Sequence, residues 1–322
     1  MSFRLAICTS VAHARFQKLL EPLSQVAVQW VSAAELPEAA NRADALVLSA
    51  ADYFPAVAHA LSGPESACRW LQLLTAGYET LQMHGVPDRL EVTNAGSVWS
   101  PMVAEHAMAM ILAVARRVPA LLAAQARGQW DDSIRQDMAM LFGARLVIVG
   151  MGSIGGELAR RARAFGMHVT GVSRSGRAHP DADQVLPVSC LHEALSQADF
   201  VVCAVPGSPT NTGLIGASEL AACSRQTVIV NLGRGNVIDT PALLHALQTG
   251  IISGAALDVT DPEPLPEGHP LWQMPNVIIS PHLGGAAPER YYDRLAHHVV
   301  HNLQARLAGQ PLKDRIEFRA SA

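Results

Sequence analysis

The chain has 322 residues, of which 49% are hydrophobic and 16% are charged, and its formal net charge is −4. This length and apolar content suffice to bury a large core and to form two domains. The slightly acidic balance and the scattered basic residues exclude the concentrated positive surface that nucleic-acid-binding proteins use.

The cysteines and the apolar runs predict a cytoplasmic protein. Its five cysteines are widely spaced and contain no C-x-x-C pair, which is typical of a reducing compartment. The first apolar stretch, residues 5–8, is too short for the apolar region of a signal peptide. The longest apolar run, residues 107–115, is less than half of the roughly 20 residues that a membrane-spanning helix needs. We therefore expect no membrane segment.

The first hundred residues predict a domain of alternating strands and helices. Short apolar runs, each followed by a loop or a helical pattern, are typical of strands in a parallel sheet. The expected strands are residues 3–8, 26–30, 45–49 and 70–74.

Ser100 and Pro101 predict the start of a helix, with serine as the N-cap and proline at the first helical position. The helix that follows, residues 102–115, is apolar on almost every side. Because a helix that is apolar all round must be buried, we interpret it as lying between domains or between two subunits. This interpretation favours a homo-oligomer.

The second half of the chain predicts a doubly wound α/β domain. Its expected strands are residues 144–149, 168–172, 200–204, 228–231, 254–257 and 277–280. Six strands alternating with helical patterns are typical of a dinucleotide-binding fold. A closing helix over residues 288–307 follows the last strand and is able to return to the first domain.

A glycine-rich turn of sequence G-M-G-S-I-G occupies residues 150–155. It follows the apolar run 146–149 and precedes the helical pattern 157–165, so strand, turn and helix are in the order that a dinucleotide site requires. The N-terminus of the helix can bind a pyrophosphate through its free N–H groups. An ordinary strand-to-helix turn is the alternative, and the context favours the dinucleotide site.

The end of the next strand favours NADP(H) over NAD(H). An acidic residue about 20 positions after the glycine turn usually binds the ribose hydroxyls of NAD. Ser173 stands there instead, followed by Arg174, Ser175 and Arg177, which can hydrogen-bond to a phosphate. The alternative is a solvated turn whose arginines stack on adenine.

Three ionisable residues, Arg234, Glu263 and His282, follow predicted strands. Open α/β sheets bind ligands at that edge. Reduction of a 2-keto acid needs a cation for the carboxylate, an acid for the developing alkoxide, and a group that holds the acid in the correct tautomer. Arginine, histidine and glutamate meet these needs, whereas a lone charge in such a loop is usually a surface ion-pair partner.

The closing helix also carries His297, His298 and His301. Two of them share a helix face, but no cysteine, glutamate or third ligand accompanies them, so we expect no metal site.

These motifs, in this order, resemble the D-isomer-specific 2-hydroxyacid dehydrogenase family over nearly the whole chain. The most specific pieces are N-L-G-R-G-N-V-I-D at 231–239, A-L-D-V-T-D-P-E-P-L at 256–265 and H-P-L-W…P-N-V-I-I-S-P-H-L-G-G at 269–285. The resemblance implies a two-domain α/β fold. In it a Rossmann dinucleotide-binding domain, residues 99–288, is inserted into a flavodoxin-like substrate domain, residues 1–98 plus 289–322. It also implies a homodimer formed largely through the inserted domain.

The resemblance further implies roles for single residues. Arg234 corresponds to the carboxylate clamp, His282 to the proton donor and Glu263 to its partner. Substrate binding is implied for Arg234, His282 and the backbone of Ala76, Gly77 and Tyr78. The motifs and the resemblance together give this set of cofactor-binding residues: Gly150, Gly152, Ser153, Ile154, Gly155, Ser173, Arg174, Ser175, Val205, Pro206, Leu232, Gly233, Arg234, Asp258, His282 and Gly284. Of these, Asp258 is expected near the nicotinamide carboxamide. Ser173 departs from the acidic residue found in many members.

The implied reaction is reduction of a small 2-keto acid to the (R)-2-hydroxy acid, with NADPH preferred and NADH possible. Glyoxylate and hydroxypyruvate are the first candidates, and phenylpyruvate-like or branched keto acids and 3-phosphoglycerate remain alternatives. A nucleotide-sensing corepressor with the same fold is a further alternative, which the lack of additional tails disfavours. Short-chain dehydrogenases are excluded because no Tyr-x-x-x-Lys motif is present.

Tyr53 and Phe54 also follow a strand of the first domain, as does Tyr78. The sequence does not decide whether these three rings line a substrate pocket or pack in the core.

Overall fold

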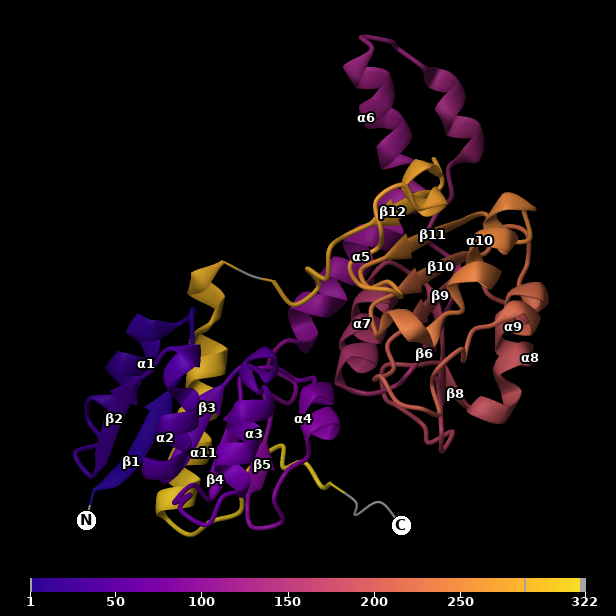
Figure 1. Ribbon diagram of the computed structural model, residues 1–322. Helices are drawn as coiled ribbons and strands as arrows, with labels where there is room; N and C mark the ends of the chain where they lie inside the picture. Colours follow the sequence, from indigo (N-terminus) through magenta and orange to yellow (C-terminus); the bar gives the residue numbers. More distant parts are fainter. Residues whose placement is uncertain (1, 287, 319–322) are drawn as a thin grey trace. The chain divides into compact units, whose positions relative to one another are not determined.

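The structure is a computed structural model that describes residues 2–286 and 288–318. The chain divides into two compact units, Met1–Trp99 with Ala287–Ala322 (unit 1) and Ser100–Ala286 (unit 2). Each unit contains a parallel sheet with helices packed against it (Figure 1). The expected α/β class is confirmed.

Across the described residues, unit 1 forms a five-stranded parallel sheet in the order β2-β1-β3-β4-β5. The strands are β1 (Phe3–Ile7), β2 (Val26–Trp30), β3 (Ala45–Leu48), β4 (Trp70–Leu73) and β5 (Glu91–Thr93). The first four agree with the predicted ranges to within one residue at either end. Strand β5 was not predicted, because a three-residue strand that contains glutamate and threonine carries no apolar run.

Helices cover both faces of the unit 1 sheet (Figure 1). Alternate residues of each strand point to opposite faces, so Leu5 and Ile7 pack in one core and Ala6 in the other. The helices of unit 1 are α1 (His13–Leu20), α2 (Leu36–Arg42), α3 (Pro55–Ser62), α4 (Glu79–His84) and α11 (Asp293–Leu307), with single turns η1 (Ala33–Glu35), η2 (Ala50–Asp52) and η7 (Glu289–Tyr291). Helices α1 and α11 contribute to the first core, and α2 to α4 contribute to the second.

The closing helix α11 packs in unit 1, where Leu295, Val299 and Leu303 are at most 1% exposed. It begins at Asp293 rather than at the predicted Pro288, because a single 3-10 turn precedes it. After α11 the chain returns to the edge of the sheet, where the Ile316 N–H donates to the Val92 carbonyl at 2.9 Å. The last described residues therefore lie beside β5.

Unit 2 forms, over its described residues, a seven-stranded parallel sheet in the order β12-β11-β10-β9-β6-β7-β8. The strands are β6 (Arg145–Val149), β7 (His168–Ser173), β8 (Gln184–Pro187), β9 (Phe200–Cys203), β10 (Val228–Asn231), β11 (Gly254–Leu257) and β12 (Val277–Ile279). Six of them match predicted strands to within one residue, and edge strand β8, which ends in proline, was missed. The strand order reverses between β6 and β9, and such switch points are where sheets of this kind bind ligands.

The helices of unit 2 are α5 (Ser100–Ala115), α6 (Val118–Ala126), α7 (Ser153–Ala164), α8 (Leu191–Ser196), α9 (Ala217–Ala222) and α10 (Thr240–Gln248), with single turns η3 (Asp132–Asp137), η4 (Val188–Cys190), η5 (Gly235–Val237) and η6 (Pro270–Gln273). The glycine turn is followed directly by α7, which starts four residues earlier than the predicted helical pattern.

Helix α5 differs from its prediction at its N-terminal end. It begins at Ser100, so this serine is a helical residue and not the expected N-cap. Within the chain its burial is uneven, because Ala104, Ala107 and Ile111 are fully buried whereas Leu112 is half-buried, and burial of the remaining side by another subunit stays a prediction. Among the described residues no single helix is long and apolar enough to cross a membrane, and α5 and α6 reach that length and composition only when they are counted together across a 62° bend.

Candidate active site

The glycine turn after β6 is tightly packed on its protein side. Gly150 has φ +111°, and a Cβ there would lie 2.6 Å from the Ala204 carbonyl oxygen. A Cβ on Gly155 would collide with the carbonyl oxygen of Gly150, whereas a Cβ on Gly152 would meet no atom within 4 Å. Glycine is thus required at the first position and the third by close approach and backbone conformation, and the middle glycine leaves the turn open on its other side.

The start of α7 has unsatisfied donors. In the part of the chain that the structure describes, the N–H groups of Gly152, Ser153 and Ile154 have no hydrogen-bond acceptor. The helix has 12 residues, and its dipole adds positive potential at this end. Together with the open face at Gly152, these donors fit the pyrophosphate of a dinucleotide.

Ser173 is the last residue of β7, and its Oγ accepts a hydrogen bond from the Gly176 N–H at 3.1 Å. The side chains of Arg174 and Arg177 are exposed, and neither guanidinium has an ion pair or a hydrogen bond within the described ranges. Two guanidinium groups without a partner among the described residues therefore follow the position at which many dinucleotide sites have an acidic residue. Such a residue would repel a phosphate, whereas these cations attract it.

His282 and Glu263 form a hydrogen-bonded pair. His282 Nδ1 lies 2.6 Å from Glu263 Oε1, and the two side chains are 48% and 42% exposed. Because a carboxylate only accepts hydrogen bonds, the proton between them belongs to Nδ1. The other ring nitrogen, Nε2, is left for a second partner. The pair comes from the loops that follow β11 and β12, which are neighbours in the sheet.

Arg234 follows β10 in a turn that the buried Asn231 supports. The Asn231 side chain donates to the Arg234 carbonyl at 2.9 Å and accepts from the Gly233 N–H at 3.2 Å. The Arg234 guanidinium donates to the Gly233 carbonyl at 2.8 Å. A Cβ on Gly233 would collide with the Val205 carbonyl oxygen, so this turn and the end of β9 lie in direct contact.

Asp258, directly after β11, binds the loop that carries His282. Its side chain is 3% exposed, and its carboxylate accepts hydrogen bonds from the Leu283 N–H at 2.8 Å and the Gly284 N–H at 2.9 Å. The Asp258 carbonyl accepts from the His282 N–H at 2.8 Å, which helps to hold His282 at φ +53°. The loop is therefore bound to one aspartate through both main chain and side chain.

Two further side chains complete the environment of the Asp258 carboxylate. Ser280 donates to it through a short hydrogen bond, and His106 Nε2, from α5, lies 3.2 Å from Asp258 Oδ1 and 2.9 Å from Ser280 Oγ. Burial by itself raises the pKa of Asp258, but the hydrogen bonds from His106, Ser280 and the two backbone N–H groups outweigh it and lower the pKa to about 2.

His106 and Ser280 were not among the predicted site residues, and the bonds from Asp258 to the loop of His282 were not predicted either. A histidine inside an otherwise apolar helix was a usable signal for His106, because a buried polar side chain needs a partner.

The three residues of the expected substrate loop lie in unit 1, directly after β4. Among the described residues, no acceptor binds the N–H groups of Ala76, Gly77 and Tyr78. Tyr53 is 1% exposed and its hydroxyl donates to the Gly85 carbonyl at 2.7 Å, so it is a core residue. Phe54 packs against the same core.

Two of the three histidines of α11 bind main-chain carbonyl groups. His297 Nδ1 lies 2.7 Å from the Asp293 carbonyl oxygen, and His298 Nε2 lies 2.9 Å from that of Asn94. His301 is exposed. Over the described residues, no group of three or more histidine, cysteine, aspartate or glutamate side chains is arranged to hold a metal ion.

Comparisons with known proteins match this chain to one family. Residues 108–284 match the family described as D-isomer specific 2-hydroxyacid dehydrogenase, NAD binding domain. Glyoxylate/hydroxypyruvate reductase B of Escherichia fergusonii is 37% identical over 244 residues, which are 73% of this chain and 74% of that protein.

Solved structures share the fold of the whole chain. A D-isomer specific 2-hydroxyacid dehydrogenase family protein from Aeromonas salmonicida matches with a TM-score of 0.87 at 30% identity, over 99% of this chain and 100% of that one. A D-isomer specific 2-hydroxyacid dehydrogenase from Xanthobacter autotrophicus, solved in complex with NADPH and MES, matches with a TM-score of 0.81 at 26% identity, over 98% of each chain.

We expect Asp258→Asn to destabilise unit 2 in a pH-dependent way. A drop of the pKa from 3.8 to about 2 means that the ionised carboxylate contributes about 2 kcal/mol of stability above pH 4, and that this is lost as the pH falls through about 2. The wild type should therefore exceed the variant by at least about 2 kcal/mol at pH 6, and the gap should narrow by about 1 kcal/mol at pH 3. Urea unfolding at both pH values measures it, and a gap independent of pH would contradict the role of the charge.

Proposed function

The chain belongs to the D-isomer-specific 2-hydroxyacid dehydrogenase family, and from this premise we propose that it reduces glyoxylate or hydroxypyruvate to the (R)-2-hydroxy acid with NADPH. The family acts on small keto or hydroxy acids with a dinucleotide cofactor, so the chain is a nicotinamide-dependent oxidoreductase. The His282–Glu263 pair, at 2.6 Å beside the sheet edge that carries the glycine turn, is the observation on which the proposed reaction rests.

His282 is the proposed proton donor. Glu263 accepts a hydrogen bond from the Nδ1–H group, which fixes the orientation of the ring and directs Nε2 to the substrate. A reduced nicotinamide bound at the glycine turn would be the source of the hydride that the carbonyl carbon receives. In its imidazolium form, with a proton on each ring nitrogen, His282 gives the Nε2 proton to the carbonyl oxygen, so that the product is the neutral hydroxyl group and not an alkoxide. The ring is then neutral and keeps the Nδ1 proton that Glu263 holds.

Arg234 and the loop of Ala76, Gly77 and Tyr78 are the proposed carboxylate-binding groups. A guanidinium binds a carboxylate through two parallel hydrogen bonds, which fixes the plane of the substrate. The loop offers consecutive N–H groups that have no acceptor within the described residues, an arrangement that binds anions.

The proposed cofactor contacts extend from the glycine turn to the catalytic loops. Gly150, Gly152, Ser153, Ile154 and Gly155 bind the pyrophosphate, and Ser173, Arg174 and Ser175 bind the adenosine ribose and its phosphate. The remaining proposed contacts, on the nicotinamide side, are Val205, Pro206, Leu232, Gly233, Arg234, Asp258, His282 and Gly284. The two unengaged guanidiniums after Ser173 support NADPH as the preferred cofactor, and the Xanthobacter autotrophicus relative is an NADPH complex.

The choice of substrate rests on the relative from Escherichia fergusonii, which is a glyoxylate/hydroxypyruvate reductase of 37% identity. A two- or three-carbon keto acid also needs no cationic site beyond the carboxylate clamp, unlike 3-phosphoglycerate.

We also propose that the enzyme is a cytoplasmic homodimer that pairs through unit 2. Helix α6 and the segment after it extend away from the sheet of unit 2 (Figure 1) and expose large apolar side chains. These are Val118, Leu121, Leu122, Trp130, Met140 and Phe142, between 36% and 98% exposed. An exposed apolar surface of this kind is typical of a subunit interface.

The first test measures oxidation of NADPH with glyoxylate and hydroxypyruvate. We expect His282→Ala to lower kcat by about 10²–10⁴-fold, because the developing alkoxide loses its proton donor. His192→Ala is a matched control, since His192 Nε2 also pairs with a carboxylate, Glu219, at 2.8 Å but lies on α8. An equal loss in both variants, or no reduction of either keto acid by the wild type, would overturn the proposed reaction.

The cofactor proposal is tested by Arg174→Ala. Loss of a charge-assisted hydrogen bond to phosphate should raise KM for NADPH by about 10–100-fold and leave KM for NADH unchanged. Arg225→Ala, at an exposed arginine before β10 on the opposite edge of the sheet, serves as the control. If KM for the two cofactors rises equally, Arg174 does not select NADPH.

The dimer proposal is tested by Leu122→Arg in sedimentation velocity. A charge placed on a 58% exposed leucine in the proposed interface should convert dimer to monomer. Met83→Arg, at a 76% exposed methionine of unit 1, should leave the dimer intact. A wild type that sediments as a monomer would contradict the proposal.

A further inference from the structure

In the loop after β4, every carbonyl oxygen from Thr75 to Tyr78 accepts a hydrogen bond. The donors are Ala95 N to Thr75 O at 3.0 Å, Asn94 Nδ2 to Ala76 O at 2.7 Å, Thr75 Oγ1 to Gly77 O at 2.9 Å and Leu81 N to Tyr78 O at 3.0 Å. The N–H groups of the same loop, described above, have no acceptor. The carbonyl groups of the loop are therefore engaged in hydrogen bonds, whereas its N–H groups are left for a ligand.

The bound carbonyls determine where the free N–H groups point. In a planar trans peptide the N–H and the C=O point in opposite directions, so a donor that holds the carbonyl of one residue also orients the N–H of the next. Ala95 thereby orients the N–H of Ala76, and Asn94 orients the N–H of Gly77. Asn94 is the side chain from outside the loop that sets the central donor.

We infer that Asn94 is a positioning residue for carboxylate binding: its side-chain amide holds the Ala76 carbonyl so that the Gly77 N–H faces the substrate. This inference rests on the proposed role of the loop. It extends that role to a residue outside the loop.

The polar atoms of Asn94 are themselves held by neighbours. Its side-chain oxygen accepts from the Gly96 N–H at 2.9 Å. Its carbonyl accepts from Gln72 Nε2 at 3.0 Å and from His298 Nε2 at 2.9 Å, and its N–H donates to the Asp314 carbonyl at 3.1 Å. The segment after α11 and α11 itself thus fix the residue that fixes the loop.

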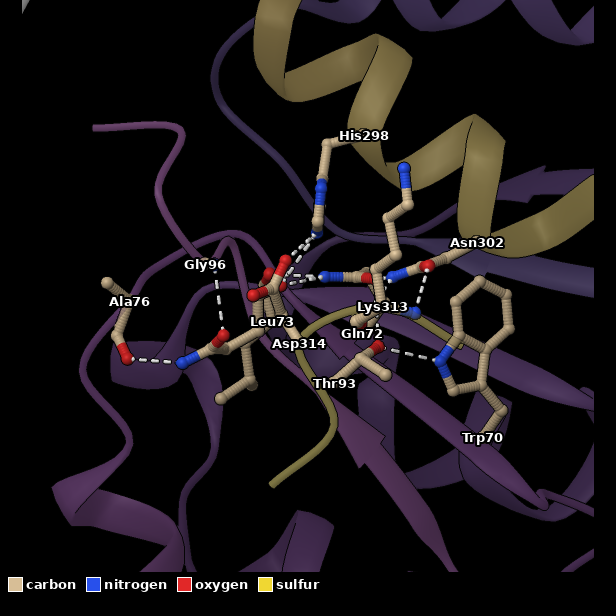
Figure 2. A network of polar contacts seen from close by, with 11 residues as sticks. Trp70, Gln72, Leu73, Ala76, Thr93, Gly96, His298, Asn302, Lys313 and Asp314 are labelled. Atoms are coloured by element: carbon tan, nitrogen blue, oxygen red, sulfur yellow. Dashed lines mark hydrogen bonds and ion pairs between the residues drawn. The ribbon is translucent and has the colours of Figure 1, made fainter. Parts of the chain in front are cut away.

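Gln72, which binds the Asn94 carbonyl, belongs to a buried network that joins β4 to α11 (Figure 2). Gln72 and Asn302 are fully buried, and Asn302 Nδ2 donates to Gln72 Oε1 at 2.9 Å and to the Lys313 carbonyl at 3.1 Å. Gln72 Oε1 also accepts from Thr93 Oγ1 at 2.8 Å. Because unmade hydrogen bonds are costly in a buried setting, this network fixes the amide orientation of Gln72 and hence the backbone position of Asn94.

A residue that merely stabilises unit 1 would change its resistance to unfolding, whereas a positioning residue changes affinity for the carboxylate and order in the loop. Asn94→Ala removes the donor to Ala76. Asn94→Asp keeps an acceptor for the Gly96 N–H but places an oxygen opposite the Ala76 carbonyl, with almost no change in shape. Asn276→Ala is a matched control, because Asn276 Nδ2 makes the same kind of bond, to the Ser253 carbonyl at 3.0 Å in unit 2.

The experiment combines steady-state kinetics with amide hydrogen exchange of the full-length enzyme. For both Asn94 variants we expect KM for the keto acid to rise roughly tenfold, kcat and KM for NADPH to change by less than about twofold, and exchange at residues 75–78 to accelerate. Asn276→Ala should show none of these changes. Titration with oxalate, which binds as a carboxylate without being reduced, should show the same roughly tenfold loss of affinity.

Unchanged exchange at residues 75–78 and unchanged oxalate affinity in folded Asn94→Asp would overturn the inference, as would equal changes in Asn276→Ala. Exchange and oxalate binding do not depend on turnover. If the wild type reduced neither keto acid, the proposed function would fail while these two measurements still decided the role of Asn94.

Discussion

The carboxylate of Asp258 is a buried charge, and the arrangement of the proposed acid depends on how that charge is satisfied. An ionised group at 3% exposure is destabilising unless several donors surround it. The donors here are supplied largely by the loop after β12, through the N–H groups of Leu283 and Gly284 and the hydroxyl of Ser280. The charge requires the loop to adopt this conformation, and the conformation in turn holds His282 at a positive φ with its ring against Glu263.

The parallel sheet of unit 2 explains how residues far apart in the sequence come to lie along one edge, where the proposed reaction needs them. Parallel strands end at a common edge, so the turns after β10, β11 and β12 follow one another across the sheet. Each turn supplies one ionisable group, namely Arg234, Glu263 or His282. The strands contribute no polar side chain to the chemistry, and the buried polar residues at their ends, Asn231 and Asp258, hold the turns instead.

The parts that were predictable from sequence are those in which a local pattern determines the outcome. Fully buried strands such as β6 and β9 are continuous apolar runs, so they could be predicted without knowledge of their neighbours. The glycine turn and the motifs that carry the proposed catalytic residues are contiguous in the sequence, so they could be recognised in the same way. Strands β5 and β8 lie at sheet edges, where apolar runs are not required, and both were missed.

The contacts that hold the proposed catalytic and substrate-binding groups could not be predicted from the sequence, because they join residues far apart in the chain. The partners of Asp258 include His106, more than 150 positions earlier in the chain, and the roles of Asn94 depend on residues near the C-terminus. Nothing in the local sequence of Asn94 signals that its amide holds the Ala76 carbonyl. Such pairings are set by tertiary packing, which a single sequence does not display.

In each unit one polar side chain fixes the direction in which a loop points its N–H groups, inward in unit 2 and outward in unit 1. The proposed roles of the two loops account for this difference. In unit 2 an anion, Asp258, collects the N–H groups of a loop and so turns them inward, which is appropriate for a loop whose task is to present a histidine ring. In unit 1 a neutral amide, Asn94, binds the Ala76 carbonyl and so turns the Gly77 N–H outward, as the proposed binding of a carboxylate requires. A carboxylate at position 94 would face the Ala76 carbonyl without a donor and would place a negative charge beside the donors for an anionic substrate. Asparagine satisfies both conditions because it donates to the carbonyl and carries no charge.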